Sequence, residues 1–478
     1  MKWILAVLVV LVPVLSGILL LIFHPRKSAR PVIAAAALTL VLAVGTAVTV
    51  RGSFTAATFM GQLPLTLGLD LFGAFFLVLI PAIFLLSVVF ALEYTEYDVK
   101  KRHVFFGFTM LTLGAMCGLC LAGNLFTFYL FFEAMSFASF PLVLYPYTAA
   151  ARGAAVKYLG FSVFGAGLVL AGMMLCGTAG LQTFAPGGVG LEKDPLHLAA
   201  WLLMAVGFAC KAGMYPLSAW LPTAHPEAPA PASAMLSGVI TKAGVLGVAR
   251  TTLFLFGAQM LAGTGAQQIM LVLTLITIFI GSMLAYKEPL LKKRLAYSSV
   301  SQLSYVLFGL MLMTPAGFTG AMLQVLFHAC AKTGLFLCAG AIIHKSGLLR
   351  TGELRGMGRR MPVTMGCFAL FSLSLVGIPP LGGFDAKWSL AMGALEYGGV
   401  LAAAGSVVLL VSALLTAGYL LPIVSIAFFP GEDFASKKCE PGRYMTLPLT
   451  VLAAVVLVFG AFPGVFSGIF DAVCAAFL

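Results

Sequence analysis

The chain has 478 residues, of which 61% are hydrophobic and only 9% are charged, and its mean hydropathy is +1.07. A soluble globular protein carries about 25% charged residues, so this chain has too few charges to solvate a water-exposed surface. Its net charge of +12 would suggest a nucleic-acid partner in a soluble protein. No basic face lies outside the short loops, however, so we expect no nucleic-acid partner.

The first apolar segment, 2–23, contains no small-residue cleavage site and is followed at once by His24, Pro25, Arg26 and Lys27. A signal peptide has the reverse charge order, so this segment is predicted to be a retained membrane helix. Further apolar segments of transmembrane length follow at 31–50, 69–92, 103–122, 124–147, 154–177, 197–221, 229–256, 267–286, 292–313, 316–344, 362–395, 401–428 and 446–470. The sequence therefore predicts an all-α polytopic membrane protein with about 14 transmembrane helices in a lipid bilayer.

Basic residues are divided unequally between the two sides of the predicted bundle. The loops after even-numbered segments, together with the N-terminus, hold only Lys2, Arg51 and Lys193. The loops after odd-numbered segments hold Arg26, Lys27, Arg30, Lys100, Lys101, Arg102, Arg152, Lys157, Lys287, Lys292, Lys293, Arg294, Lys345, Arg350, Arg355, Arg359, Arg360, Lys437, Lys438 and Arg443. Since cytoplasmic loops are rich in Lys and Arg, we expect an inner (cytoplasmic) membrane protein with both termini on the outer side.

The remaining five of the 28 basic residues lie inside predicted spans: Lys211, Lys242, Arg250, Lys332 and Lys387. A charged side chain at the bilayer centre costs roughly 2.5–3.5 kcal/mol on insertion scales, so such residues indicate function. The four lysines lie on different predicted helices, and all but Lys387 lie at similar depth. They therefore form a row across the membrane plane.

One carboxylate, Glu133, lies at the same depth as these lysines, near the middle of its segment. Lysine suits a proton relay because its protonation responds to burial and to nearby charges. A static salt bridge that holds two helices together is the alternative for any single pair. One carboxylate cannot neutralise four lysines, however, so the row as a whole favours a relay.

Two predicted helices are interrupted beside a lysine. Pro216 follows Lys211 by five residues, and the stretch GIPPLGG at 377–383 precedes Lys387. Proline removes backbone hydrogen bonds from a helix, and discontinuous helices expose backbone polar groups to ions and water inside transporters. A plain kink is the alternative at either site alone.

Histidines supply further candidates for proton transfer. His328 and Lys332 are four residues apart, hence on one helix face, and histidine titrates near neutral pH. His225 and Glu227 lie in a Pro-rich turn on the predicted cytoplasmic side, where they would admit protons, although a loop histidine is more often simply solvated. His344, at the end of its segment, is a candidate capping or relay residue.

The other conspicuous polar residues have simpler interpretations. Arg250 does not release its proton in practice, so it is expected to be a fixed charge that tunes the row or a helix-end residue that reaches the interface. Asp70 opens a helix, where the helix dipole favours a carboxylate. Cys117 and Cys120 form a CxxC within an apolar helix with no second pair or His nearby, so we expect no metal site and no cofactor.

Several segments carry a family resemblance: NLFTFYLFFEAMSFASFPLV (124–143), KAGMYPLSAWLPTAHPEAPAPASAMLSGVITKAGVLGVAR (211–250), LKKRLAYSSVSQLSYVLFGL (291–310), FHACAKTGLFLCAGAIIH (327–344) and GIPPLGGFDAKW (377–388). They resemble the antiporter-like proton-channel subunits shared by respiratory complex I, Mrp-type cation/proton antiporters and energy-converting membrane-bound hydrogenases. The long block at 211–250 is the most specific of them.

The resemblance implies two inverted five-helix repeats, at 103–256 and 267–428, with broken seventh and twelfth helices. They would be flanked by a three-helix segment at 1–102 and a C-terminal helix at 446–478.

The resemblance also implies roles for individual residues. Glu133 would pair with Lys211, Lys242 would be the central lysine, His328 and Lys332 would bridge to the second half, and Lys387 would be the terminal lysine. Asp385 stands where the family pattern has an uncharged residue, and we expect it to pair with Lys387 and tune its protonation.

The favoured function is a proton-translocating subunit of a multisubunit redox-driven ion pump of the hydrogenase or complex I type. No catalytic chemistry is expected in this chain. Its partners would be other membrane subunits, including related antiporter-like ones, and a soluble redox arm carried by other chains. The alternatives are a subunit of an Mrp-type Na⁺/H⁺ antiporter, in which Na⁺ would be handled indirectly because Na⁺ needs oxygen ligands, and a structural membrane scaffold.

Overall fold

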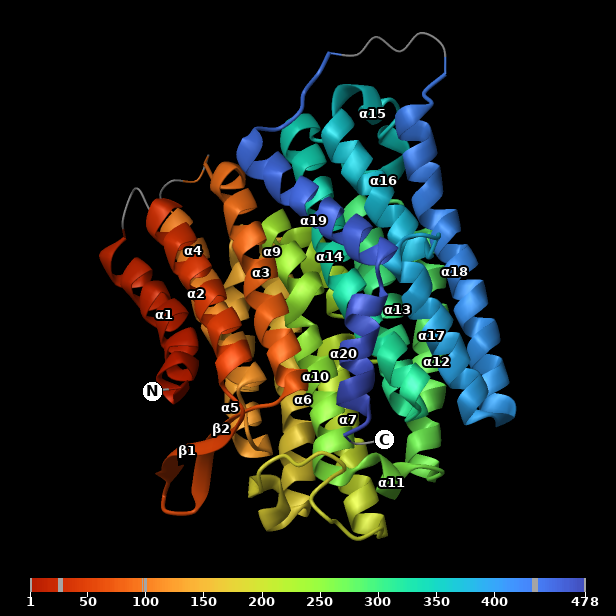
Figure 1. Cartoon of the computed structure of the whole chain (residues 1–478). Helices are drawn as coiled ribbons and strands as arrows, with labels where there is room; N and C mark the ends of the chain where they lie inside the picture. The colour runs from red at the N-terminus through yellow and green to blue at the C-terminus, as the bar shows by residue number, and fades with distance from the viewer. Residues whose placement is uncertain (1, 25–28, 97, 99–100, 432–436, 477–478) are drawn as a thin grey trace.

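The computed structural model describes residues 2–24, 29–96, 98, 101–431 and 437–476 (Figure 1). Three basic residues used above for orientation, Arg26, Lys27 and Lys100, lie outside the described residues, as does Pro25. Thirteen helices of the described part are long and apolar enough to cross a membrane. This confirms the prediction of a polytopic helical membrane protein.

The long helices follow one another in chain order and are α1 (Lys2–Phe23), α2 (Ala29–Thr49), α3 (Leu71–Tyr94), α4 (Arg102–Cys120), α5 (Leu125–Leu144), α6 (Ala149–Leu175), α7 (Pro195–Ala212), α9 (Ala230–Met235) continued by α10 (Lys242–Ala249), α12 (Gly265–Lys287), α13 (Leu291–Leu312), α14 (Pro315–Ser346), α18 (Gly399–Phe428) and α19 (Arg443–Ala461). The shorter helices are α8 (Leu221–Glu227), α11 (Ala258–Leu261), α15 (Met357–Arg360), α16 (Pro362–Val376), α17 (Gly382–Tyr397) and α20 (Gly464–Cys474).

Both predicted helix breaks are confirmed. The helix predicted at 197–221 ends at Ala212 as α7, and α8 begins only at Leu221. The segment 362–395 divides into α16 and α17, and neither of these two helices is among the thirteen. Two further irregularities escaped the sequence analysis. The segment 446–470 divides into α19 and α20, and the segment 229–256 contains two π-helical stretches, Leu236–Ile240 and Arg250–Phe256.

The expectation of helices alone missed one β-hairpin between α2 and α3. Strand β1 (Gly52–Phe59) pairs in antiparallel fashion with β2 (Leu63–Leu69), with Gly52 opposite Leu69 and a bulge near Thr55. All residues of β1 are exposed, whereas the last four residues of β2 are buried. The hairpin therefore attaches to the bundle through β2.

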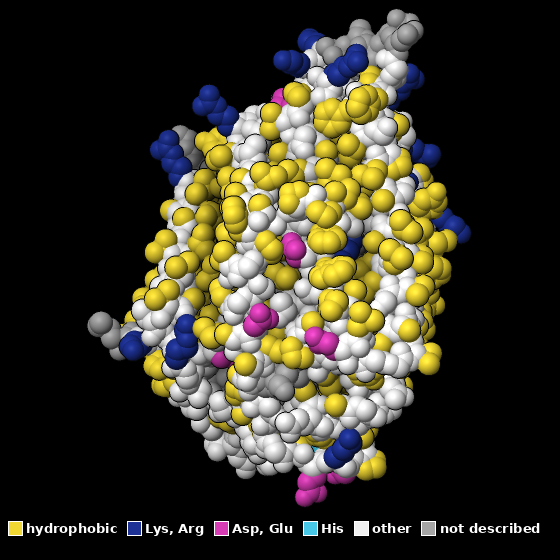
Figure 2. Space-filling model, turned by 45° about the vertical axis from the view of Figure 1, so that its right-hand side comes forward, with side chains coloured by type: hydrophobic (Ala, Val, Ile, Leu, Met, Phe, Trp, Pro, Cys, Tyr) yellow, Lys and Arg dark blue, Asp and Glu magenta, His cyan; other side chains and the backbone are white. Residues whose placement is uncertain are grey.

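The two ends of the bundle differ in charge. In Figure 1 the hairpin and α11 lie at the lower end with both termini in the lower half, whereas α15 lies at the upper end. We call these the hairpin end and the basic end. Lys and Arg side chains gather toward the basic end above a broad apolar belt (Figure 2). The described Lys and Arg side chains on this face are thus concentrated at one end of the bundle.

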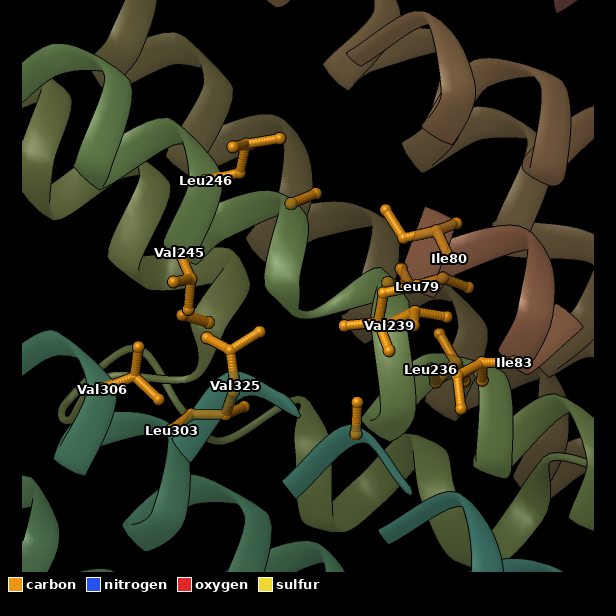
Figure 3. Close-up of a cluster of buried hydrophobic side chains, with 14 of the residues drawn as sticks. Leu79, Ile80, Ile83, Leu236, Val239, Val245, Leu246, Leu303, Val306 and Val325 are labelled. Atoms are coloured by element: carbon orange, nitrogen blue, oxygen red, sulfur yellow. The ribbon is translucent and has the colours of Figure 1, made fainter. Parts of the chain in front are cut away.

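The best-buried helices form the centre of the molecule. The spans differ in how much of their most apolar stretch is buried inside the protein. This share is 100% for 230–256 and 94% for α13 and for α14, but only 28% for α1 and for α2. A hydrophobic cluster forms where α3, the π-helical stretch Leu236–Ile240, α10, α13 and α14 meet (Figure 3); its labelled members are Leu79, Ile80, Ile83, Leu236, Val239, Val245, Leu246, Leu303, Val306 and Val325. Lys242 and Lys332 therefore lie on helices surrounded by protein.

Candidate functional site

Lys211 lies at the end of α7, beside the first helix break, and is only 2% exposed. The helix ends because Gly213 adopts a left-handed conformation with φ of 86°, which glycine tolerates best. Lys211 Nζ donates to Ser136 Oγ (3.0 Å), Tyr158 OH (2.7 Å) and Ser162 Oγ (3.0 Å). Three neutral hydroxyls thus satisfy all three ammonium donors.

Glu133 is half-buried on α5, one helical turn before Ser136. Tyr129 OH donates to its Oε1 (3.3 Å), and Oε2 has no hydrogen-bond partner among the described residues. The expected direct pair with Lys211 is not present in the described part of the chain, because the three hydroxyls occupy the ammonium. Lys211 remains within electrostatic reach of the carboxylate.

Lys242 and His328 form the centre of the site. Lys242 begins α10, directly after a π-helical stretch, and its Nζ donates to the carbonyl of Ser237 (2.6 Å). The same Nζ lies 2.7 Å from His328 Nδ1 on α14, and both side chains are at most 1% exposed. When Lys242 carries its proton, Nδ1 must accept the hydrogen bond, which places the imidazole hydrogen on Nε2.

Lys332 lies one turn after His328 on α14, as the spacing predicted, and is completely buried. Its Nζ donates to the carbonyl of Leu295 on α13 (3.1 Å). Lys332 is close enough to Lys242 for their charges to interact. Among the described residues, neither lysine forms a salt bridge with a carboxylate, so backbone carbonyls and an imidazole hold both.

His225 is not in a solvated loop, contrary to one interpretation of the sequence. It lies on α8, is completely buried, and stacks on Phe336 with ring centroids 4.7 Å apart. Neither ring nitrogen has a hydrogen-bond partner in the described part of the chain. Its ring lies within electrostatic reach of Lys292 and Lys332.

A cavity of about 310 Å³ adjoins His225 along the chain and is lined by Glu227, Asp98 and Lys292, among others. Lys292 Nζ donates to the carbonyl of Pro226 (2.9 Å). From the sequence, Lys292 was expected only to mark the basic side of the bundle. Its position at the start of a predicted helix did not indicate that its side chain would contact the end of α8.

Lys387 lies just after the second helix break. Its Nζ donates to the carbonyls of Leu375 (2.6 Å) and Val376 (2.8 Å), the last residues of α16. These carbonyls are free of intrahelical partners and lie at the negative end of the helix dipole. The expected pair with Asp385 is not found among the described ion pairs, because Asp385 occupies the first turn of α17 while Lys387 reaches back to α16.

A buried polar network on α12, α13, α14 and α18 was missed by the sequence analysis. Its hydrogen bonds join Gln324 to Gln302 (2.7 Å), Ser298 to Tyr419 (2.6 Å), Ser282 to Ser301 (2.8 Å) and Ser282 to Ser412 (2.6 Å). The available signal was the polar run SSVSQLS at 298–304.

This network occupies the part of α13 between two of the lysines. Leu295 supplies the acceptor for Lys332, and the ring of Tyr305 lies 5.5 Å from Lys387 Nζ. The polar face of α13 therefore runs from one lysine toward the other.

Arg250 and Asp70, treated separately in the sequence analysis, form one ion pair. Arg250 Nη2 donates to Asp70 Oδ1 (2.9 Å), and Nη1 donates to Oδ2 (2.5 Å). Burial alone would raise the pKa of the Asp70 carboxyl. The Arg250 charge, its hydrogen bonds and the backbone N–H of Gly73 instead hold that pKa below its usual value.

His344 lies apart from the row of lysines, at the exposed end of α14. It lines a cavity of about 380 Å³ with Glu93, Glu96 and Lys345, and Lys345 forms an ion pair with Glu93 (3.4 Å). Its interpretation as a relay residue remains a prediction.

Residues 122–416 match the family described as NADH:quinone oxidoreductase/Mrp antiporter, TM. The chain belongs to this family. It is an antiporter-like membrane subunit related to those of complex I, Mrp antiporters and hydrogenases, and it crosses the membrane many times.

Three relatives illustrate this breadth. NADH-quinone oxidoreductase subunit N of Desulforudis audaxviator is 32% identical over 422 residues, which cover 84% of this chain and 81% of that protein. A Na(+)/H(+) antiporter subunit of Alkalihalophilus pseudofirmus is 27% identical over 468 residues, covering 95% and 93%. Hydrogenase-4 component B of Escherichia coli is 32% identical over 344 residues, covering 68% of this chain and 50% of that protein.

Solved structures of multisubunit complexes share the fold. A chain of the Mrp complex from Dietzia sp. DQ12-45-1b superposes with a TM-score of 0.88 at 24% identity, covering 100% of this chain and 97% of that one. A chain of respiratory complex I from Thermus thermophilus superposes with a TM-score of 0.82 at 26% identity, covering 98% and 99%. In these neighbours the corresponding subunit lies beside other membrane subunits.

Proposed function

We propose that this chain translocates protons along a row formed by Glu133, Lys211, Lys242, Lys332 and Lys387, with His328 between the two central lysines. It would do so as a subunit of a redox-driven pump of the complex I or membrane-bound hydrogenase type, whose redox arm belongs to other chains. The observation that carries the proposal is that neutral groups hold all four lysines of the row, three of them buried and Lys387 partly buried. A lysine held by hydroxyls, carbonyls or imidazole can lose its proton without leaving a buried anion unpaired.

The position of each lysine supports movement of protons. Lys211 and Lys387 lie at helix breaks, and Lys242 follows a π-helical stretch, so three of the four lie beside backbone that small rearrangements can alter. Lys242 and His328 share one hydrogen bond, and either partner can hold its proton. A proton can therefore pass between α10 and α14 without a large movement of side chains.

Protons would enter this row from the basic end. The cavity lined by Glu227 and Lys292 adjoins buried His225, whose unsatisfied nitrogens provide a site for a proton or water molecule. Lys332 lies within electrostatic reach of His225, as Lys292 does. In this scheme Glu133 and Lys211 set the charge state of the first half, and Lys387 ends the row.

We also propose that 103–256 and 267–428 are two inverted repeats, between a three-helix segment at 1–102 and a C-terminal segment at 446–478. In support, each repeat contains five membrane segments, and the fourth segment of each is the broken one. We place the chain in the inner (cytoplasmic) membrane with the basic end in the cytoplasm, because cytoplasmic loops are rich in Lys and Arg. Both termini and the hairpin end would then face outward.

A second candidate, a subunit of an Mrp-type Na⁺/H⁺ antiporter, is favoured by the match to the Alkalihalophilus pseudofirmus antiporter protein over 95% of the chain. Sodium requires several oxygen ligands, whereas Glu133 is the one carboxylate of the proposed row. A Na⁺ path would therefore lie in a partner subunit. Proton flux that depends on Na⁺ in vesicles containing the complex would favour this candidate.

The test uses inside-out vesicles that contain the assembled complex. Glu133→Gln and Lys211→Ala should each abolish proton uptake driven by turnover while the complex still assembles. Normal proton uptake in both variants would contradict the proposal. Loss of assembly in Lys242→Ala, with no separate effect on transport, would instead favour a structural scaffold.

A further inference from the structure

Arg250 lies on the same helical segment as Lys242, eight residues nearer the hairpin end. At a rise of about 1.5 Å per residue, this places it about 12 Å further along the helix axis. Its side chain is 3% exposed, whereas the Asp70 side chain that binds it is 36% exposed. Water at the hairpin end thus meets the carboxylate first and the guanidinium behind it.

Three aromatic rings surround the guanidinium. Its Cζ lies 4.5 Å from the centroid of Phe254, 5.2 Å from that of Phe72 and 5.6 Å from that of Phe184. Such contacts favour a cation over the ring faces. Arg250 is therefore held both by its ion pair with Asp70 and by a desolvated aromatic cage.

The backbone around this cage is tied down. The π-helical stretch Arg250–Phe256 leaves carbonyls that the loop before α7 satisfies. Ala185 N donates to the carbonyl of Phe254 (3.1 Å), and Gly187 N donates to that of Leu253 (3.1 Å). The loop that carries Phe184 is thereby fixed against the helix that carries Arg250.

The two sides of the pair have different surroundings. Toward the hairpin end, cavities of about 210 and 350 Å³ are both lined by Asp70, and Arg250 lines the smaller one. Toward the centre, α10 presents the buried apolar residues Val245 and Leu246 before Lys242 is reached (Figure 3). The pair therefore lies between the cavities at the hairpin end and an apolar segment of α10.

We infer that the Asp70–Arg250 pair is a proton seal, which prevents exchange of protons between the hairpin-end solution and Lys242. This inference rests on the proposed proton row. An arginine does not release its proton at accessible pH, so a proton taken up by Asp70 finds no onward acceptor. Protons reaching Lys242 must then leave through the second half of the chain, toward Lys387.

The experiment measures passive proton permeability of vesicles containing the assembled complex, without turnover. Arg250→Gln should raise the rate of pH-gradient decay several-fold. Arg250→Lys is the decisive variant, because it keeps the positive charge yet restores a proton that can be released; it too should leak. Arg51→Gln is the control for loss of an exposed charge at the same end, since among the described residues Arg51 donates to the carbonyls of Ala47 and Val50 rather than to Asp70.

A second variant separates a leak through the row from general damage. Adding Lys242→Ala to Arg250→Lys should return the decay rate to the wild-type value, because the onward acceptor is gone. A leak that persists in this double variant, or an Arg250→Lys complex as tight as wild type, overturns the seal. The permeability measurement needs no turnover. It therefore tests the seal independently of the proposed function, even if the Glu133 and Lys211 variants pump normally.

Discussion

Lys242 Nζ and His328 Nδ1 lie 2.7 Å apart at the centre of the molecule, on two helices that are almost entirely buried. Their side chains share one hydrogen bond that either partner can donate. His328 also lies one turn from Lys332, so it is the single described imidazole between the two central lysines. Proton transfer between α10 and α14 therefore depends on this contact.

Replacing His328 tests that dependence. His328→Gln should keep an acceptor near Lys242 but remove the titratable group, so proton pumping should fall strongly while the complex assembles. His328→Leu should in addition leave the ammonium short of one hydrogen bond, at a cost of about 1–3 kcal/mol in the free energy of unfolding. Turnover-driven proton uptake and thermal unfolding measure the two effects, and full pumping in His328→Gln would contradict the role.

The two helix breaks share a glycine in the left-handed conformation, Gly213 with φ of 86° and Gly377 with φ of 90°. Gly213→Ala and Gly377→Ala should each lower the stability of the chain by about 1 kcal/mol or more, because a Cβ disfavours this conformation. Gly366→Ala is the matched control: it lies within α16 with open space around it. That change should be neutral or stabilising by up to about 1 kcal/mol, and equal effects at all three positions would disprove the argument.

The spans and the five buried basic residues could be predicted because a bilayer imposes an apolar length and makes charge costly within it. The hydrogen-bond partners of Lys211 could not be predicted from the sequence. Serine and tyrosine are common in membrane helices, and packing of α5, α6 and α7 is what brings Ser136, Tyr158 and Ser162 within 3.0 Å of its Nζ. The direct Glu133–Lys211 pair that the family resemblance implied is absent among the described ion pairs, because these neutral hydroxyls hold the ammonium.

Two other features, an ion pair and a hairpin, were not predicted from the sequence. Asp70 and Arg250 are 180 positions apart, and each had a sufficient local explanation, so nothing in the sequence connected them. The hairpin was missed although β2 carries the signal of a half-buried strand, since Leu63, Leu65, Leu67 and Leu69 alternate with Pro64, Thr66 and Gly68. Strand β1 is exposed on every residue and has no buried apolar face.

The ion pair also predicts a pH dependence. Because the folded-state pKa of Asp70 is lowered, its contribution to stability is fully present above the usual aspartate pKa of about 3.9 and is lost as pH falls through the lower folded value. Asp70→Asn should therefore be less stable than wild type at pH 7, and the difference should shrink as pH approaches 3. Thermal unfolding across this range is the measurement, with Arg51→Gln showing no such convergence. A gap that stays constant with pH would contradict the assignment.

Lys387 and Asp385 give the last prediction, because the sequence expected them to act together and the geometry separates them. Lys387→Met should strongly reduce proton pumping, since it removes the group bonded to the carbonyls of Leu375 and Val376. Asp385→Asn should retain most of the pumping, because no described contact joins the carboxylate to Lys387 Nζ. Proton uptake at equal complex content compares the two variants. A loss in Asp385→Asn as large as that in Lys387→Met would restore the original pairing and show that the carboxylate sets the protonation of the terminal lysine.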